Sequence, residues 1–461
     1  MEWRPGRKLV AGAAAATALA CGHAGCSTSS SPTPAPDAST AQPTITFGVS
    51  DALTGGLAGL GVGVNQAVGV AARQINQVGI LGGRQVVLDV RDDTSDPTQA
   101  RDIVQALLAE GVAGVLGPLS SGQVHNVQDL TYLAKTVEIT PSATSTILTI
   151  DQPAGDRYLF RTAPSDSFQG RAIVRFVRDG VAPSSDAGEA GMLGGTCRAA
   201  FIVNGSDTYG SALGDVVQTT FPSASAQVLG RDPVQTTLQS DYSSTVNDIV
   251  TAHPDCLVLV VYSDVAAELL RELGKAIAAD TGHDWSKFFV CGSDGEYDAK
   301  FIPDAQSDPG DPRSANSAAG CYGTAPDPAP NTPGYAAFKD IWEQSYPGVT
   351  PPAYGASIYD AALLLALAIQ QAGTASDGTR IRDALRVVAT PPGTSFGPAE
   401  FVDALNAISK GIDIDYDGAS GHCDFDPSGD VKADYVVWQV QKQADGTYAF
   451  ASLGAIKEAD L

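Results

Sequence analysis

Two serine-rich loops carry hydrogen-bond donors in a pattern that suits a bound anion. Gly117–Gly122 (GPLSSG) follows a short apolar strand predicted at Val112–Leu116, and Pro141–Ser145 (PSATS) follows the next predicted strand, Val137–Thr140. Hydroxyl groups and free backbone N–H groups at the start of a helix attract an anion such as a carboxylate. Each loop by itself is better explained as an ordinary helix N-cap, so the pair needs further support.

Two other motifs resemble catalytic or metal-binding sequences but lack the required context. Gly393–Gly397 (GTSFG) has the spacing of a nucleophile elbow, yet no strand is predicted before it. Asp413–Gly418 (DIDYDG) with Asp424 resembles a calcium loop, but Asp replaces the usual Glu and strand residues follow. We interpret the first as coincidental and the second as a solvated crossover, with a metal loop as the less favoured alternative. The histidines do not have the spacing of metal ligands. Because no set of nucleophile, base or metal ligands is found, we predict no enzyme, metal or cofactor.

The elements that position the serine-rich loops alternate between strand and helix. One series runs from a strand at Thr44–Ser50 to Val137–Thr140, and a second runs from Ala199–Val203 to Phe288–Cys291. Short connections between such elements predict an α/β fold with parallel sheets and helices on both faces. Ligands bind outside the carboxyl ends of the strands in these sheets, where both loops would lie. After the Pro- and Gly-rich stretch Asp304–Pro333, three more helices and short C-terminal strands are predicted.

The composition excludes two broad classes of protein. The chain has 461 residues and a net charge of −24, with 43% hydrophobic and only 17% charged residues. This content supports a large core and argues against global disorder. Nucleic-acid binding needs clustered Lys and Arg, which the sequence lacks, so we predict no nucleic-acid partner.

The first 43 residues are predicted to export and tether the protein. Residues 1–20 have a basic start and a 12-residue apolar run, which fits a signal peptide and is too short to span a bilayer. Ala18–Cys21 (ALAC) resembles a bacterial lipobox, so Cys21 is the predicted lipidation site, with Cys26 as competitor and plain export as the alternative. Residues 21–43 are rich in Ser, Pro and Thr and are predicted to be a tether. The expected location is the outer face of a bacterial cell membrane, held by a lipid anchor.

Taken together, ordered segments through the body resemble the branched-chain amino-acid (Leu/Ile/Val-binding) family of type I periplasmic binding proteins. These are substrate-binding subunits of ABC importers. Besides the two serine-rich loops, the segments that carry the resemblance are Leu53–Gly55, Arg91–Asp93, Asp96–Pro97, Phe160–Thr162, Gln169–Gly170, Asp207–Gly210, Asp241–Tyr242, Gly292–Gly295, Tyr359–Ala361, Asp424–Asp426 and Gly429–Asp430.

The resemblance covers about Thr44–Leu453 and implies a Venus-flytrap fold. Two three-layer α/β lobes, each a parallel sheet flanked by helices, would be joined by three crossover strands. Lobe 1 would take residues 44–163 and 326–410, and lobe 2 residues 164–325 and 411–461. The expected role is an extracytoplasmic lipoprotein that binds a branched-chain-like amino acid and delivers it to an ABC permease with its ATPase subunits.

The resemblance also implies the ligand-binding residues. Hydroxyl and backbone donors of lobe 1 would hold the ligand carboxylate, and Asp294 of lobe 2 would hold its ammonium group. Tyr209 and Tyr262 match aromatic positions that close over the ligand, and Tyr354 matches a side-chain pocket position. The lobe 1 positions are Ser121, Ser142, Ala143 and Thr144. The alternative for Asp294 is that it is an exposed turn residue. The alternative for Tyr262 and Tyr354 is ordinary packing.

Two departures from the family pattern leave the ligand open. Leu60 stands where the family often has an aromatic residue, and the lobe 2 acid is Asp294 where the family has a longer Glu. Another small solute, namely an amide, urea or an aromatic carboxylate, is the alternative ligand. A ligand-sensing domain for a receptor is the alternative role.

Export permits disulfides, although the sequence cannot fix their connectivity. Cys197 and Cys256 begin strands that are expected to be neighbours in lobe 2, so they could pair. Cys291 and Cys321 lie in strands that the family places adjacent to each other, so they could form a second pair. Cys423 would then be left over.

Overall fold

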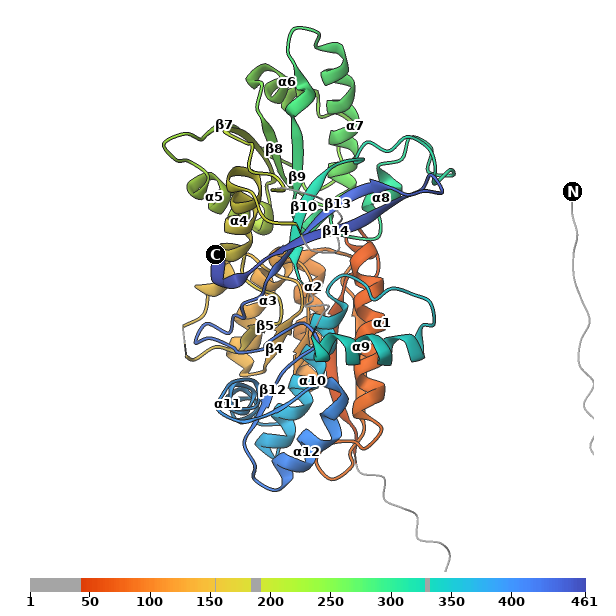
Figure 1. Cartoon of the computed structure of the whole chain (residues 1–461). Coiled ribbons are helices and arrows are strands. Elements are labelled where there is room, and N and C mark those ends of the chain that lie inside the picture. Colours follow the sequence, from red (N-terminus) through yellow and green to blue (C-terminus); the bar gives the residue numbers. More distant parts are fainter. Residues whose placement is uncertain (1–42, 154, 184–191, 328–331) are drawn as a thin grey trace, which may run out of the picture. The chain divides into compact units, whose positions relative to one another are not determined.

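The computed structural model describes residues 43–153, 155–183, 192–327 and 332–461. The predicted signal peptide, Cys21, Cys26 and residues 21–42 of the tether lie outside the described residues. The described part contains two separate large sheets, which confirms the predicted α/β class with flanked parallel sheets (Figure 1).

The first sheet has five strands, and all of its pairings are parallel. In spatial order the strands are β2 (Val86–Asp92), β1 (Ile45–Asp51), β3 (Val115–Leu116), β4 (Glu138–Thr140) and β5 (Leu159–Arg161). The central strands are apolar and buried, as expected for a parallel sheet that is covered on both faces. We call this sheet with its helices lobe 1.

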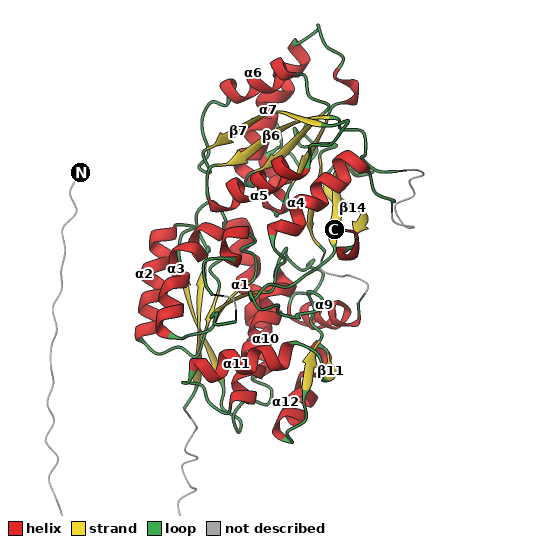
Figure 2. Cartoon of the chain, turned by 90° about the vertical axis from the view of Figure 1, so that its left-hand side faces the viewer, coloured by secondary structure: helices red, strands yellow, loops and turns green. Residues whose placement is uncertain are grey.

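Helices cover both faces of the lobe 1 sheet (Figure 2). One face carries α2 (Pro97–Ala109) and α3 (Ser121–Ala134). The other carries α1 (Ala58–Ile75), α9 (Pro333–Ser345), α10 (Gly355–Ala372), α11 (Gly378–Ala389) and α12 (Phe401–Ser409). Among the described helices, α10 alone is long and apolar enough to cross a membrane, but nearly all of its side chains are buried. It packs against α1 and α11 as the central helix of the lobe 1 core.

The second sheet has seven strands and forms lobe 2 with its helices. In spatial order the strands are β14 (Tyr448–Ile456), β13 (Tyr435–Lys442), β10 (Tyr322–Pro326), β9 (Phe289–Gly292), β8 (Cys256–Val260), β6 (Ala199–Gly205) and β7 (Gln227–Val234). Strands β10, β9, β8, β6 and β7 are parallel, whereas β13 and β14 join as antiparallel neighbours at one edge (Figure 1).

Two apolar cores flank the lobe 2 sheet. One is formed with α4 (Asp166–Val174) and α5 (Thr208–Thr220). The other is formed with α6 (Ser243–Ala252), α7 (Ser263–Ala279) and the short α8 (Phe301–Asp304). Alternate residues of a strand enter opposite cores, since side chains in a strand point to alternate faces: Val437 lies with α4 and α5, and Trp438 lies with α7 and α8.

One predicted disulfide is confirmed and the other is wrong. Cys197 and Cys256 form a disulfide with their Cα atoms 5.6 Å apart. Cys291 and Cys321 are buried free thiols, as is Cys423. The reason is the register, because Cys291 of β9 lies opposite Tyr322 of β10. Cys321 is one residue out of register, so its side chain enters the core on the opposite face of the sheet from Cys291.

The chain runs through lobe 1 and then lobe 2, returns to lobe 1, and ends in lobe 2. The Asp-rich run at Asp413 lies in and after β12 (Ile414–Tyr416), which pairs in parallel with β11 (Thr394–Phe396). Buried residues from Ile414 to Val431 belong to the lobe 1 core. This packing favours a boundary between the lobes after Val431 over the expected boundary after Lys410.

Candidate functional site

The predicted ligand-binding residues of both lobes lie where parallel strands end. In lobe 1, Ser121 begins α3 just after β3, and Ser142 follows β4. In lobe 2, Tyr209 lies in the first turn of α5 after β6, Tyr262 lies between β8 and α7, and Asp294 follows β9. This is the general ligand position of open α/β sheets.

A cavity with walls from both lobes brings most of these residues together. Six of the eight predicted ligand-binding residues line it, namely Ser121, Ser142, Tyr209, Tyr262, Asp294 and Tyr354. Ala143 and Thr144 are not among its lining residues and are buried beside it. The cavity has a volume of about 40 Å³, roughly three times the space that one water molecule needs. The cavity is thus small and lies between the two lobes.

Asp294 is the acidic centre of the cavity. It is 8% exposed, and its Oδ1 accepts a hydrogen bond of 2.7 Å from the Tyr209 hydroxyl. Its Oδ2 accepts a second hydrogen bond from the hydroxyl of Tyr354, which belongs to lobe 1. Burial raises the pKa of Asp294, while the hydrogen bonds from Tyr354 and Tyr209 partly oppose that rise. The Asp294 carboxylate thus connects the two lobes and faces the cavity.

Tyr354 reaches Asp294 from an unusual backbone position. It precedes α10 with φ of +57°, in the left-handed region that a bulky residue seldom occupies. Such strain is kept where the surrounding structure fixes a side chain for a task. Here the backbone conformation directs the Tyr354 ring into the cavity. Tyr354 therefore lines the candidate site, whereas the alternative from the sequence was ordinary packing.

Two stacked tyrosines form the lobe 2 wall. The rings of Tyr209 and Tyr262 lie 5.6 Å apart with 26° between their planes. The Tyr262 hydroxyl donates to Asp207 Oδ2 at 3.0 Å, and Asp207 also accepts the backbone N–H of Gly210 at 2.9 Å as the N-cap of α5. Burial raises the pKa of Asp207 and of Tyr262. These contacts hold a flat aromatic surface against the cavity.

The lobe 1 side of the cavity supplies hydroxyl groups at the start of α3. Ser121 Oγ accepts the backbone N–H of Ser145 at 3.1 Å, which leaves its own proton free to be donated to a ligand. Ser142 Oγ donates to the Leu119 carbonyl at 2.9 Å. Ser120 forms a capping box with Gln123, so the N-cap explanation holds for that residue. The Ser145 hydroxyl reaches across to the Thr208 carbonyl of lobe 2 at 2.9 Å.

The cavity also has lining residues that were not among the eight predicted ligand-binding residues. Leu57, Leu60 and Leu119 form an apolar wall on lobe 1. Lobe 2 adds Gly295, Tyr297 and Asp298, which follow Asp294 directly in the sequence. The sequence signal that could have identified these lobe 2 residues is their position in the loop after β9, because a loop at a strand end offers several consecutive residues to a cleft.

The cavity wall is acidic. Asp294 and Asp298 line it, and no Lys or Arg does so among the described residues. Burial raises the pKa of Asp298, whose Oδ1 accepts the backbone N–H groups of Lys300 and Phe301. Burial also raises the pKa of Glu296, directly behind the cavity, to about 8. Among the described residues, no group of three His, Cys, Asp or Glu side chains is arranged to hold a metal ion.

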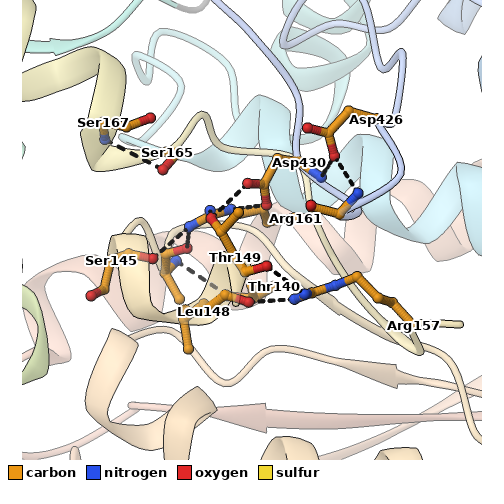
Figure 3. A network of polar contacts seen from close by, with 12 residues as sticks. Thr140, Ser145, Leu148, Thr149, Arg157, Arg161, Ser165, Ser167, Asp426 and Asp430 are labelled. Atoms are coloured by element: carbon orange, nitrogen blue, oxygen red, sulfur yellow. Dashed lines mark hydrogen bonds and ion pairs between the residues drawn. The ribbon is translucent and has the colours of Figure 1, made fainter. Parts of the chain in front are cut away.

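A buried ion pair joins two segments that lead from lobe 1 to lobe 2 (Figure 3). Arg161 ends β5, and its Nε lies 2.6 Å from Oδ1 of Asp430, which precedes β13. Arg161 Nη1 donates to the Ser145 carbonyl at 3.0 Å, and its Nη2 donates to Thr149 Oγ1 at 2.5 Å. The Thr149 hydroxyl donates in turn to Asp430 Oδ2 at 2.7 Å. This network fixes the start of the connection between the lobes.

Two comparisons of sequence identify the family. A family model described as periplasmic binding protein matches residues 44–414. A Leu/Ile/Val-binding protein of Rhizobium johnstonii is 25% identical over 342 residues, which cover 74% of this chain and 83% of that protein. A chemotactic signal transduction system substrate-binding protein of Halobacterium salinarum is 26% identical over 393 residues, which cover 84% of each chain.

Solved structures agree with the fold. A leucine-binding protein of Thermotoga maritima has a TM-score of 0.70 and 21% identity, covering 91% of this chain and 100% of that one. A solute-binding protein of an ABC transporter from Rhodopseudomonas palustris, in complex with 3,4-dihydroxybenzoic acid, has a TM-score of 0.66 and 16% identity, covering 90% and 98%. At such identities the likeness establishes the Venus-flytrap fold alone. The family match extends over most of the chain, and this protein therefore belongs to the periplasmic binding protein family.

Proposed function

We propose that this protein binds a small zwitterionic amino acid, of the branched-chain kind, between its lobes and delivers it to an ABC permease. The observation that carries this proposal is the polarity of the cavity. Hydroxyl donors at the start of α3 lie on lobe 1, and the Asp294 carboxylate faces them from lobe 2. An amino acid presents its carboxylate and its ammonium group to two such surfaces at once.

The carboxylate would be bound at the first turn of α3. Ser121 has a free hydroxyl proton there, and the positive end of the helix dipole favours an anion. The N-terminus of α5 lies close by, since a Cβ added to Gly122 would come within 3.8 Å of Thr208 Oγ1. Two helix N-termini therefore flank the proposed carboxylate position.

The ammonium group and the side chain would occupy the rest of the cavity. Asp294 already accepts hydrogen bonds from two tyrosines, which favours its ionised form toward a cation. Leu57, Leu60 and Leu119 offer apolar contact, which suits an aliphatic side chain. The Rhizobium relative carries the name Leu/Ile/Val-binding protein, which agrees with this ligand class.

Replacing Asp294 tests the proposal. We expect Asp294→Asn to weaken binding of leucine, isoleucine or valine at least about 30-fold, because a buried charge pair loses one partner at a cost of 2 kcal/mol or more. Isothermal titration against the common amino acids would measure the affinities. Thermal denaturation would verify that the variant stays folded.

Asp298→Asn is the matched control, since Asp298 lines the same cavity but uses one carboxylate oxygen to cap α8. Its effect should be several-fold smaller. Equal affinity of Asp294→Asn and the unaltered protein would place the ammonium group elsewhere. Absence of binding by every common amino acid would reject the ligand class.

A second candidate ligand is an aromatic carboxylate. Tyr209, Tyr262, Tyr297 and Tyr354 surround the cavity, and the Rhodopseudomonas structure holds 3,4-dihydroxybenzoic acid. Against this candidate, an anion without an ammonium group would leave Asp294 and Asp298 without a cation. Binding of 4-hydroxybenzoate or 4-methylpentanoate, the des-amino analogue of leucine, with an affinity similar to that of leucine would favour it.

Delivery to a permease, lipid anchoring at Cys21 and location at the outer membrane face belong to the same proposal. Sensing for a receptor is the alternative role, and the Halobacterium relative bears the name of a chemotactic substrate-binding protein. Neighbouring genes for a permease and an ATPase would support transport, whereas neighbouring genes for a kinase would favour sensing. Mass spectrometry of the mature N-terminus would distinguish lipidated Cys21 from Cys26 and from plain cleavage.

A further inference from the structure

Asp166 is a buried acid near the cavity, and the Thr144 hydroxyl is its nearby hydrogen-bond donor. Asp166 is the first residue of α4 and is fully buried. Neither of its carboxylate oxygens accepts a hydrogen bond of standard geometry from the described residues. Its backbone N–H donates to the Thr144 carbonyl at 2.8 Å, which places Asp166 directly against the second serine-rich loop.

Asp166 and Asp294 belong to one electrostatic unit. Gln169, one turn after Asp166 on α4, donates to the Thr324 carbonyl at 3.1 Å and lies near enough to Asp294 to stabilise its carboxylate. Burial raises the pKa of Asp166 well above its ordinary range, and the nearby Asp294 carboxylate raises it further. Two carboxylates in one low-dielectric region do not both ionise readily, so the pair favours holding a proton.

The contacts decide which acid holds that proton. Asp294 receives hydroxyl hydrogen bonds from Tyr209 and Tyr354, which stabilise its anion. Asp166 accepts no hydrogen bond of standard geometry, and the nearby Thr144 hydroxyl opposes the effect of burial only in part, so its anion is the less stable of the two.

Other polar groups near Asp166 do not reverse this order. The groups that interact with Asp166 electrostatically, besides Asp294, are Thr144, Arg161, Asp207, Tyr209, Tyr262, Tyr354 and Tyr435. The cation among them, Arg161, is committed to Asp430 at 2.6 Å. Asp207 adds negative charge, and the tyrosines are neutral near pH 7, because burial raises the pKa of Tyr209, Tyr262, Tyr354 and Tyr435.

We propose that Asp166 holds a proton in the unliganded protein and releases it to solvent when a ligand ammonium group binds at Asp294. This inference rests on the proposed function. The O–H bond of Asp166 breaks, its proton passes to the buffer, and the positive charge of the ligand balances the new carboxylate. Asp166 does not line the cavity, so it acts on the ligand through charge and is a positioning residue.

Proton release makes affinity depend on pH in a defined direction. The pKa of Asp166 is raised in the unliganded protein and is expected to fall when a cation binds nearby. Between those two values, one proton leaves for each ligand bound, so the association constant rises up to tenfold per pH unit. Above the unliganded value the affinity becomes independent of pH. A ligand without an ammonium group would show no such rise.

Calorimetry of the intact protein with L-leucine tests the inference. Titrations at one pH in buffers of different ionisation enthalpy give the number of protons released per ligand. We expect close to one for the unaltered protein near neutral pH and close to zero for Asp166→Asn. The variant should match the unaltered protein at low pH and bind more weakly at high pH.

Glu138→Gln is the matched control, because Glu138 is another fully buried acid and its pKa is raised to about 8. Glu138 accepts a hydrogen bond from Thr131 and does not line the cavity. Its proton count should equal that of the unaltered protein. The infrared difference spectrum between the unliganded unaltered protein and Asp166→Asn should show one protonated carboxyl band, because Glu138 and Glu296 contribute equally to both proteins and cancel. A proton count near zero in the unaltered protein, or an unchanged count in Asp166→Asn, would overturn the inference while leaving amino-acid binding intact. Failure of every amino acid to bind would instead remove the proposed function, and the infrared band would still decide whether Asp166 carries a proton.

Discussion

Buried charged side chains differ in this protein according to their partners. Arg161 and Asp430 form a pair in which each charge meets the other and several hydroxyl or carbonyl groups (Figure 3). Asp294 instead meets tyrosine hydroxyls and has no basic partner in the cavity wall as described. A buried carboxylate with neutral donors is ready to receive a cationic ligand, whereas a paired carboxylate serves the fold.

The Arg161–Asp430 pair predicts a large loss of stability on substitution. Asp430→Asn would leave the 2%-exposed Arg161 side chain without a counter-charge, which costs about 3–5 kcal/mol for a buried pair. The expected result is a clearly lower midpoint of thermal denaturation. Asp434→Asn is the control, because its partner Lys457 is 65% exposed and such pairs contribute at most about 1 kcal/mol. Similar midpoints for the two variants would show that the Arg161–Asp430 pair does not hold the connection between the lobes.

At the scale of elements, strand register decides which cysteines meet. Cys197 and Cys256 lie in the same core, between the lobe 2 sheet and α4 and α5. Cys291 belongs to that core as well, but Cys321 lies in the core on the opposite face, with α7 and α8. Adjacent strands are therefore not sufficient for a disulfide, since a shift of one residue exchanges the faces.

The Cys197–Cys256 disulfide predicts a stability difference between the oxidised and the reduced protein. It joins residues separated by 59 positions, and loop-closure entropy for such a length corresponds to about 4 kcal/mol. We expect Cys197→Ala with Cys256→Ala to unfold at a lower urea concentration than the unaltered protein, with a reductant removing that difference. Cys423→Ala is a control that breaks no disulfide. Peptide mapping without reductant should find Cys291, Cys321 and Cys423 as free thiols, and a Cys291–Cys321 linkage would contradict the register.

At the scale of the whole molecule, the sequence was sufficient for the fold class and for the strand ends that bear the site. The alternation of strands and helices along the sequence indicated two sheets of parallel strands. The resemblance to the family implied that Ser121, Tyr209 and Asp294 share a site, and all three line one cavity. Features that depend on three-dimensional packing could not be predicted from the sequence. Asp298 belongs to no motif, and the packing of Ile414 on lobe 1 follows from a short β11–β12 pair that local pattern did not indicate.

At the same scale, two hydrogen bonds between the lobes are expected to set the balance between open and closed molecules. The Tyr354 hydroxyl of lobe 1 donates to Asp294 of lobe 2, and the Ser145 hydroxyl donates to the Thr208 carbonyl at 2.9 Å. A hydrogen bond to a charged group contributes about 1.5–3 kcal/mol. Tyr354→Phe removes one such bond and no other polar atom, so it should lower the ratio of closed to open molecules about tenfold or more.

Small-angle scattering would detect that change. We expect the unliganded Tyr354→Phe variant to have a larger radius of gyration than the unaltered protein and to return to the compact value at saturating L-leucine, because the proposed ligand would contact both lobes. Its apparent affinity should fall in proportion to the closed fraction. Tyr132→Phe is the matched control, since the Tyr132 hydroxyl bonds Asp156 within lobe 1 at 3.3 Å. Identical scattering of the Tyr354→Phe variant and the unaltered protein would show that this bond does not set the balance between open and closed lobes.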